Sequence, residues 1–221
     1  YDAAGRKTAE TNANNEVILY TYSPSGELLT LTDGKNQVST WQYDEYCRQT
    51  NKLDHTSTSV FQYKYDANGR LTNRWTPAKG HTYYAYNAVG GLTNVNYAAS
   101  TDIQMKYDAL GRMTNMVDAA GTTDYAFDSG GRLLSEDGPW ADDTVSYGYH
   151  TNGLRASLSV ALPLMAGVPW TQTYAYDAGN RLTNITSAAG AFGYLYHVGQ
   201  SVSPASLIRK LSLPGGSYIT N

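Results

Sequence analysis

A tandem repeat of about 21 residues constrains the fold of this chain more than any other feature of its sequence. Each copy is built around one aromatic residue, here called the anchor, followed by a short turn and an Arg; the fullest copy reads Tyr65-Asp-Ala-Asn-Gly-Arg-Leu-Thr72. A period of this size indicates an array of supersecondary units that pack against their neighbours. The anchors are Tyr1, Tyr22, Tyr43, Tyr65, Tyr86, Tyr107, Phe127, Tyr149, Tyr176 and Tyr196, and we expect Tyr218 to open one further copy.

The residues around each anchor predict a β-hairpin. A second aromatic residue stands two positions before most anchors, as Tyr63 does before Tyr65, and this alternation is typical of a strand with both rings on one face. Asp after the anchor and Gly three residues later suit a type I turn or a turn closed by a glycine bulge. Arg-Leu-Thr-Asn then predicts a returning strand. Second turns are expected near 33–35, 77–80, 119–121 and 188–190.

We therefore predict an all-β chain of tandem antiparallel hairpins, one per repeat, with no helix longer than two turns outside 155–173. Residues 1–221 would form a single array of about ten repeats, cut from a larger protein that carries any targeting signal. The long step from Tyr149 to Tyr176 contains an insertion at 156–173. Because Pro163 and Pro169 oppose an uninterrupted central strand, we interpret it as a protruding hairpin or loop, with a lid or a partner-docking loop as the alternative.

Composition shows what could supply the core and which functions are disfavoured. Leu, Ile, Val and Phe are scarce, whereas the chain has 20 Tyr and 4 Trp, so we expect the repeated rings to form the core as a stacked aromatic ladder. Exposed rings that stack on sugars or on single-stranded bases are the alternative. The net charge of -3 gives no basic footprint for nucleic acid, and no apolar stretch is long enough to span a membrane.

The register of these copies resembles the YD-repeat (Rhs) family over essentially the whole chain. That resemblance implies a curved or spiralling sheet that forms part of the wall of a hollow shell, as in bacterial Rhs and Tc toxins, where the shell encloses a C-terminal toxic domain, and in the animal teneurins, where it serves adhesion. This sequence departs from the pattern at Glu27 and Gly91 in the Arg position, Cys47 in the Gly position, and His150 and His197 in the Asp position. The family's self-cleaving Asp segment has no match here.

The residues that we expect to carry the structural motif fall into four classes. Besides the anchors Tyr1 to Tyr196 named above, they are the turn residues Asp2, Asp44, Asp66, Asp108, Asp128 and Asp177, the glycines Gly5, Gly26, Gly69, Gly90, Gly111, Gly131 and Gly153, and the arginines Arg6, Arg48, Arg70, Arg112, Arg132 and Arg181.

Candidate catalytic groups are all better explained by structure. The recurring Asp residues share nearly one environment, whereas an acid/base pair needs two environments that separate the pKa values. The cluster Asp137–Asp143 lacks the ligand spacing of a calcium loop and is expected to be a solvated turn. His150 and His197 are expected to replace Asp and to hydrogen-bond locally, and Cys47 to be structural. We expect no enzyme activity, no cofactor and no metal.

The sequence thus predicts a structural shell segment that encapsulates a C-terminal toxin or effector domain. The alternative is an adhesion module that binds carbohydrate or a cell-surface partner. The expected partners are the rest of the parent chain and its enclosed C-terminal domain, with carbohydrate as a further candidate and no nucleic acid. The expected location is secreted or at the cell surface.

Overall fold

The computed structural model of the chain describes residues 1–161, 169–197 and 207–220. These residues form twenty β-strands and one 3₁₀ turn, η1 (Pro214–Gly216), and contain no α-helix, which confirms the predicted all-β class. The chain divides into two compact units, Tyr1–Met105 and Lys106–Asn221. The single array over residues 1–221 stays a prediction.

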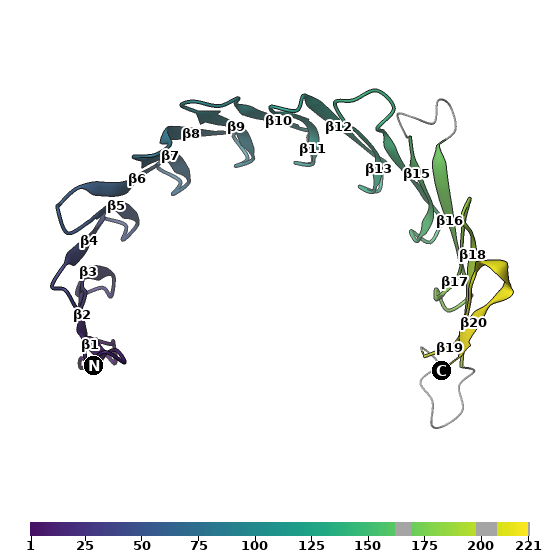
Figure 1. The fold of residues 1–221 in the computed structure, drawn as a ribbon. Coiled ribbons are helices and arrows are strands. Elements are labelled where there is room, and N and C mark those ends of the chain that lie inside the picture. The colour runs from purple at the N-terminus through teal and green to yellow at the C-terminus, as the bar shows by residue number, and fades with distance from the viewer. Residues whose placement is uncertain (162–168, 198–206, 221) are drawn as a thin grey trace. The chain divides into compact units, whose positions relative to one another are not determined.

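The strands are short and regularly spaced along the chain (Figure 1). The first unit contains β1 (Ala9–Thr11), β2 (Val17–Tyr22), β3 (Leu28–Thr32), β4 (Val38–Tyr43), β5 (Gln49–Leu53), β6 (Ser59–Tyr65), β7 (Leu71–Thr76), β8 (Gly80–Tyr86) and β9 (Leu92–Tyr97), and β10 (Ile103–Tyr107) contains the boundary between the units. The second unit contains β11 (Met113–Val117), β12 (Thr122–Phe127), β13 (Leu133–Asp137), β14 (Val145–Tyr149), β15 (Arg155–Val160), β16 (Trp170–Tyr176), β17 (Leu182–Ser187), β18 (Gly190–Tyr196), β19 (Ile208–Ser212) and β20 (Tyr218–Thr220).

Within each unit, every strand pairs antiparallel with the next strand along the chain, from β1 to β10 and from β11 to β20. The predicted hairpins are therefore confirmed. The anchors from Tyr22 to Tyr196 each end an even-numbered strand, so their turns recur at one end of the hairpins. Tyr218 was predicted to open another copy, but it begins β20 after η1 and pairs with Ser212, so it is not equivalent to the other anchors.

The turn after each anchor from Tyr1 to Tyr176 is a type I turn closed by a bulge. In the copy at Tyr65, the Gly69 amide donates to the Asp66 carbonyl (3.0 Å) and the Asp66 amide donates to the Arg70 carbonyl (2.9 Å). Asp66 Oδ1 also accepts the amides of Asn68 and Arg70, both at 2.9 Å. The register shifts at Tyr65, as a bulge requires. The φ angle is positive at Gly69 (79°) and at Gly111 (78°), which fits the glycine-closed turn that the sequence predicts.

The predicted aromatic core is wrong, because each unit is a single-layer sheet (Figure 1). Val95 is the only apolar side chain buried among the described residues, and Asn73 and Thr82 are the buried polar ones. The rings two residues before and at the anchor do share one face, as Tyr20 and Tyr22 do in β2, but both are half-buried. A one-layer sheet has no second layer to cover its rings.

The insertion at 156–173 lengthens a hairpin. Its first residues continue β15 and its last begin β16, and the two strands pair from Ser157 with Thr173 to Val160 with Trp170. The strand portion confirms the interpretation as a hairpin. Its tip, 162–168, lies outside the described residues.

Candidate functional site

Where a turn contains the motif arginine, that arginine links its hairpin to the next one. Arg70 Nε donates to Asp66 Oδ2 of its own turn at 2.7 Å. The Arg70 guanidinium then lies over the ring of the following anchor, Tyr86, with 4.7 Å from Cζ to the ring centroid. Its Nη1 donates to the Asn87 carbonyl, at 3.3 Å. One side chain therefore joins a carboxylate, a ring face and a backbone carbonyl across two repeats.

The same arrangement recurs in both units, and we call it the arginine ladder. Six guanidinium groups lie 4.7–4.9 Å from the next anchor ring, and each Nε donates to its own Asp at 2.6–2.7 Å. Such a contact stabilises by about 0.5–1 kcal/mol when exposed and more when desolvated. The pairs are Arg6 with Tyr22, Arg48 with Tyr65, Arg70 with Tyr86, Arg112 with Phe127, Arg132 with Tyr149 and Arg181 with Tyr196.

The anchor hydroxyls complete the link in the reverse direction. Tyr86 donates to the carbonyl of Leu71, which directly follows Arg70, at 2.8 Å. Two hydrogen bonds therefore join these consecutive repeats. The Arg donates to a carbonyl of the next turn, and the Tyr of the next repeat donates to the carbonyl of the residue after the Arg. The equivalent bonds, at 2.8–2.9 Å, are Tyr22 to Lys7, Tyr43 to Leu28, Tyr65 to Gln49, Tyr149 to Leu133 and Tyr196 to Leu182.

The ladder has an electrostatic signature at its carboxylates. At Asp66 and Asp108 the pKa is lowered, chiefly because the backbone amide at the Arg position donates to the carboxylate, with the Arg side chain adding to the effect against partial burial. At Asp2 and Asp128 the pKa is lowered for the same first reason. These groups are held as carboxylates in closely similar environments.

The copy at Tyr22 departs from the pattern, since Glu27 occupies the Arg position. Hydrogen bonds, first from the Ser23 hydroxyl and then from Cys47, lower the pKa of Glu27 to about 2. In turn Glu27 raises the pKa of the Cys47 thiol. Cys47 takes the glycine place of the next turn at φ 61° and is exposed.

The copy at Tyr149 departs in a second way, with Leu154 in the Arg position. The His150 backbone makes the turn bonds, but its ring Nε2 donates to the Tyr174 carbonyl of the next hairpin, at 3.2 Å. The ring also makes an edge contact with the next anchor, Tyr176, at 5.8 Å between centroids. The expectation that His150 bonds locally, as Asp does, is therefore wrong. At His197 the backbone amide donates to the Leu207 carbonyl.

Other candidate groups occupy ordinary structural places. The Asp143 carboxylate accepts the amides of Gly138 and Trp140, both at 3.0 Å, which fits the solvated turn expected for Asp137–Asp143. Within the described ranges, no three His, Cys, Asp or Glu side chains gather as a metal site would require. Nor does this part of the chain contain a helix of the length and apolar character that crossing a membrane needs.

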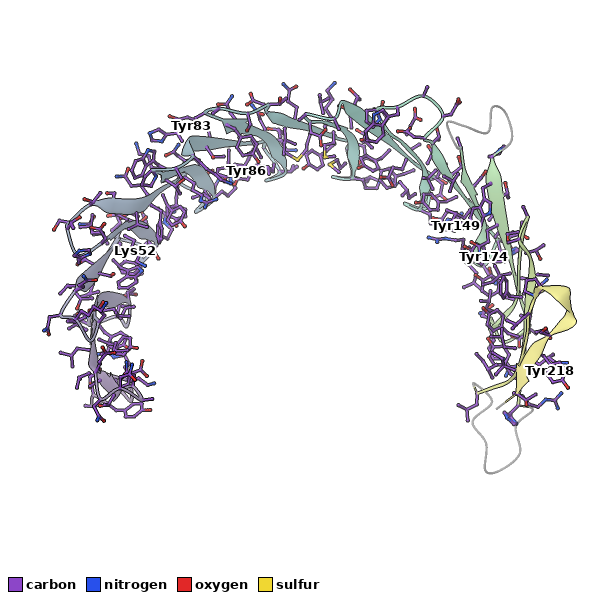
Figure 2. All side chains as sticks on the ribbon, in the orientation of Figure 1. Lys52, Tyr83, Tyr86, Tyr149, Tyr174 and Tyr218 are labelled. Carbon is purple, nitrogen blue, oxygen red and sulfur yellow. The ribbon has the colours of Figure 1, made fainter. Side chains whose placement is uncertain are left out.

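An aromatic strip that the sequence reasoning missed lies on the face opposite the anchors. His81 stacks on Tyr83 with ring centroids 5.6 Å apart, and Trp75 lies 6.5 Å from His81. The buried Asn73 amide accepts from His81 Nδ1 at 3.1 Å. Figure 2 shows Tyr83 and the anchor Tyr86 on opposite faces of β8, and 51% of Tyr83 is exposed. The sequence signal for this strip was the pattern Trp75-x₅-His81-x-Tyr83, in which the rings alternate with the positions that face the anchors.

Comparisons with known proteins agree with the fold of antiparallel hairpin repeats. Residues 1–121 match the family described as Teneurin YD-shell, and residues 107–139 match the RHS Repeat. No curated protein matches the chain. Two crystal structures share the fold at 15% identity: TcdB2-TccC3-TEV (TM-score 0.62, 96% of this chain) and TcdB2-TccC3 without its hypervariable C-terminal region (TM-score 0.58, 91% of this chain).

This chain spans only 12% of the length of either of those structures. The Teneurin YD-shell match covers more than half of this chain. The matched residues include the Asp–Arg pairs of four of the six rungs of the arginine ladder. The chain belongs to the teneurin YD-shell family and is a shell-like YD-repeat segment.

Proposed function

We propose that this chain is a wall segment of a hollow shell that encloses a C-terminal toxin or effector domain of its parent protein, and that it is not an enzyme. The observation that carries the proposal is the arginine ladder, which joins six of the hairpins to the hairpin that follows without help from a second layer. A sheet held in this way can separate an inside from an outside. The similar protein TcdB2-TccC3 has a hypervariable C-terminal region, which parallels the proposed enclosed domain. A secreted or surface location fits this role.

The carboxylates support a role without catalysis. Each ladder Asp is bound to the Arg four residues later, and its pKa is lowered in the same direction in every complete copy. General acid/base chemistry needs one group whose pKa is moved toward the working pH. The pKa values of the ladder Asp residues are moved away from a neutral working pH.

Protease protection of the parent protein tests the wall function. We expect the region C-terminal to the repeats to survive digestion in the intact parent and to be cut in the double variant Arg48→Leu/Arg70→Leu. Arg74→Leu is the matched control, because Arg74 is an exposed strand residue outside the ladder. Equal cleavage of that region in the intact parent and after its release as a separate fragment would rule out enclosure.

A second candidate function, carbohydrate binding, is favoured by the strip formed by Trp75, His81 and Tyr83. Rings on an open sheet face can stack on the apolar face of a sugar, while Asn and His supply hydrogen bonds. A glycan array followed by titration calorimetry tests it, and Tyr83→Ala should abolish any binding found. Tyr46→Ala, which removes another exposed ring of the same unit, is the control. Absence of any glycan signal would remove this candidate.

A further inference from the structure

Among the turns that follow Tyr1 to Tyr176, three have no ladder arginine, at Glu27, Gly91 and Leu154, and the step from Leu154 to Tyr176 lies wholly within the second unit. The rings of Phe127, Tyr149 and Tyr196 each carry a guanidinium at 4.7–4.8 Å. Tyr176 carries none from the described residues, because Leu154 stands where Arg would be. Nor does the Tyr176 hydroxyl make the return bond to the strand of Leu154 in the part of the chain that the structure describes. Both directions of the link are missing at this step.

The gap at this step is a pocket open to the surface and not a collapsed contact. It has a volume of about 210 Å³ and is lined by His150, Thr151, Asn152, Tyr176 and Asp177. Pockets for drug-sized molecules measure roughly 300–1,000 Å³, so this cavity suits the head group of one side chain. His150 touches the Tyr176 ring from one side at 5.8 Å and leaves this space beside it.

Two of the three groups that hold a guanidinium elsewhere in the same unit, a ring face and a backbone carbonyl, are present here, whereas His150 replaces the turn Asp. Arg132 donates to the carbonyl of His150 (3.4 Å), and Arg112 to that of Asp128 (3.1 Å), the residue after each next anchor. The equivalent carbonyl here is that of Asp177, which accepts the turn amide of Asn180 as Asp128 accepts that of Gly131. A carbonyl oxygen has two lone pairs, so a guanidinium can share it. Leu154 offers no donor.

The chain's own arginines do not supply the missing group. Arg155 lies over the Tyr147 ring at 5.1 Å, and Arg181 is bound to Asp177 and lies over Tyr196. The residues outside the described ranges, 162–168, 198–206 and 221, include neither Arg nor Lys. A guanidinium that fills the site therefore comes from another polypeptide segment.

We propose that the cavity between the turns at His150 and Asp177 binds an arginine side chain presented by a second polypeptide. The guanidinium lies over Tyr176 and donates to the Asp177 carbonyl, which repeats the geometry of Arg132 over Tyr149. Arg fits better than Lys because a planar guanidinium can stack on the ring while its edge donates a hydrogen bond. The proposal goes beyond the wall function and does not depend on what the shell encloses.

Nuclear magnetic resonance on the complete chain tests the proposal with short blocked peptides. The probe is acetyl-Gly-Arg-Gly-amide, compared with the same peptide carrying citrulline, which has nearly the same shape without the charge, or Lys. We expect saturable shifts at the Tyr176 and His150 ring signals with the Arg peptide, with a Kd in about the millimolar range. The Tyr149 ring, already covered by Arg132, is the internal control and should not shift.

Two variants of one residue make the test decisive. Leu154→Arg supplies the guanidinium within the chain and should weaken peptide binding at least about tenfold, whereas Leu154→Met should leave it unchanged. Free arginine is a second arm, and binding equal to that of the blocked peptide would show that a small molecule suffices. Equal shifts with the citrulline peptide, no shift with any probe, or undiminished binding to Leu154→Arg would overturn the proposal.

Discussion

Three residues after Asp66 and Asp108, the backbone enters the left-handed region that L side chains rarely adopt. Gly69 and Gly111 occupy it at φ 79° and 78°, and Cys47 occupies the same turn place at φ 61°. A β-branched residue is poorly tolerated there, because its Cβ crowds the backbone. A Cβ at Gly111 would meet no atom of a more distant residue within 4 Å, so any cost of a side chain comes from the local backbone conformation.

Gly111→Val is therefore expected to destabilise the fold by about 1–2 kcal/mol through backbone strain. The reverse change at the same turn place, Cys47→Gly, should stabilise by a few tenths to about 1 kcal/mol. Denaturant midpoints of both variants measure this. An unchanged midpoint for Gly111→Val would show that the turn type is wrong.

The carboxylates of the ladder predict how stability depends on pH. Because the pKa of Asp66 and of its equivalents is lower folded than unfolded, their contribution is fully present above the unfolded pKa of about 3.9. It is lost as the pH falls through the lower folded values. Urea midpoints should be flat from about pH 7 to 5 and should fall below pH 4.

Asp66→Asn serves as the control for this acid dependence. Asn keeps the turn acceptor but does not titrate in this range, so the variant should lose less stability between pH 5 and pH 3 than the parent chain. Equal losses in both would show that Asp66 does not contribute to the acid transition.

At the scale of the hairpin, the contact between Arg70 and Tyr86 connects the turn before β7 to the end of β8. A double-mutant cycle with Arg70→Leu and Tyr86→Leu should give a coupling free energy of about 1 kcal/mol, since it contains a partly exposed cation–π contact and its associated hydrogen bonds. Arg70→Lys should recover only part of it, because Lys cannot bond Asp66 and the Asn87 carbonyl with one planar group. Additive single effects would contradict the ladder.

The hairpins could be predicted from the sequence because their signals are local. Asp66 and Gly69 specify a turn within four residues, and Tyr63 and Tyr65 specify a strand face by alternation. These signals depend on backbone preferences that act before any distant packing. For the same reason the Cys47 turn keeps the register despite its unfavourable residue.

The arginine ladder could not be predicted in the same way. Arg6 reaches the Ser23 carbonyl across 17 residues, and nothing in a single turn indicates which ring lies beneath its guanidinium. The sequence did contain a signal for the gap in the ladder. Leu154 replaces Arg in the copy that precedes the longest step of the repeat. The aromatic core was predicted wrongly because burial depends on a second layer, and no local pattern shows whether one exists.

At the scale of the whole molecule, contacts between neighbouring hairpins make stability a sum of local terms. In such arrays, each repeat depends on its own folding free energy and on its interfaces with adjacent repeats. A destabilising substitution should therefore affect only its own repeat and the adjacent ones. This behaviour differs from that of a globular core, where one cavity affects most of the domain.

Hydrogen exchange should show this locality. Arg70→Leu is expected to speed amide exchange in β6 to β9 and to leave the amides of β16 to β18 unchanged. Leu154→Arg, which restores the missing link, should instead slow exchange in β14 to β17. Uniform changes along the chain in either variant would indicate one cooperative unit in place of a local array.

The arginine ladder runs in one direction, and this affects how the protein is made. Each Arg depends on a ring and a carbonyl that follow it, and Arg6 finds its carbonyl only 17 residues later. On the ribosome, the contacts of each ladder arginine are therefore completed by residues that are synthesised after it. During synthesis, the arginine whose ring and carbonyl are not yet made therefore lies in the part of the chain nearest the ribosome.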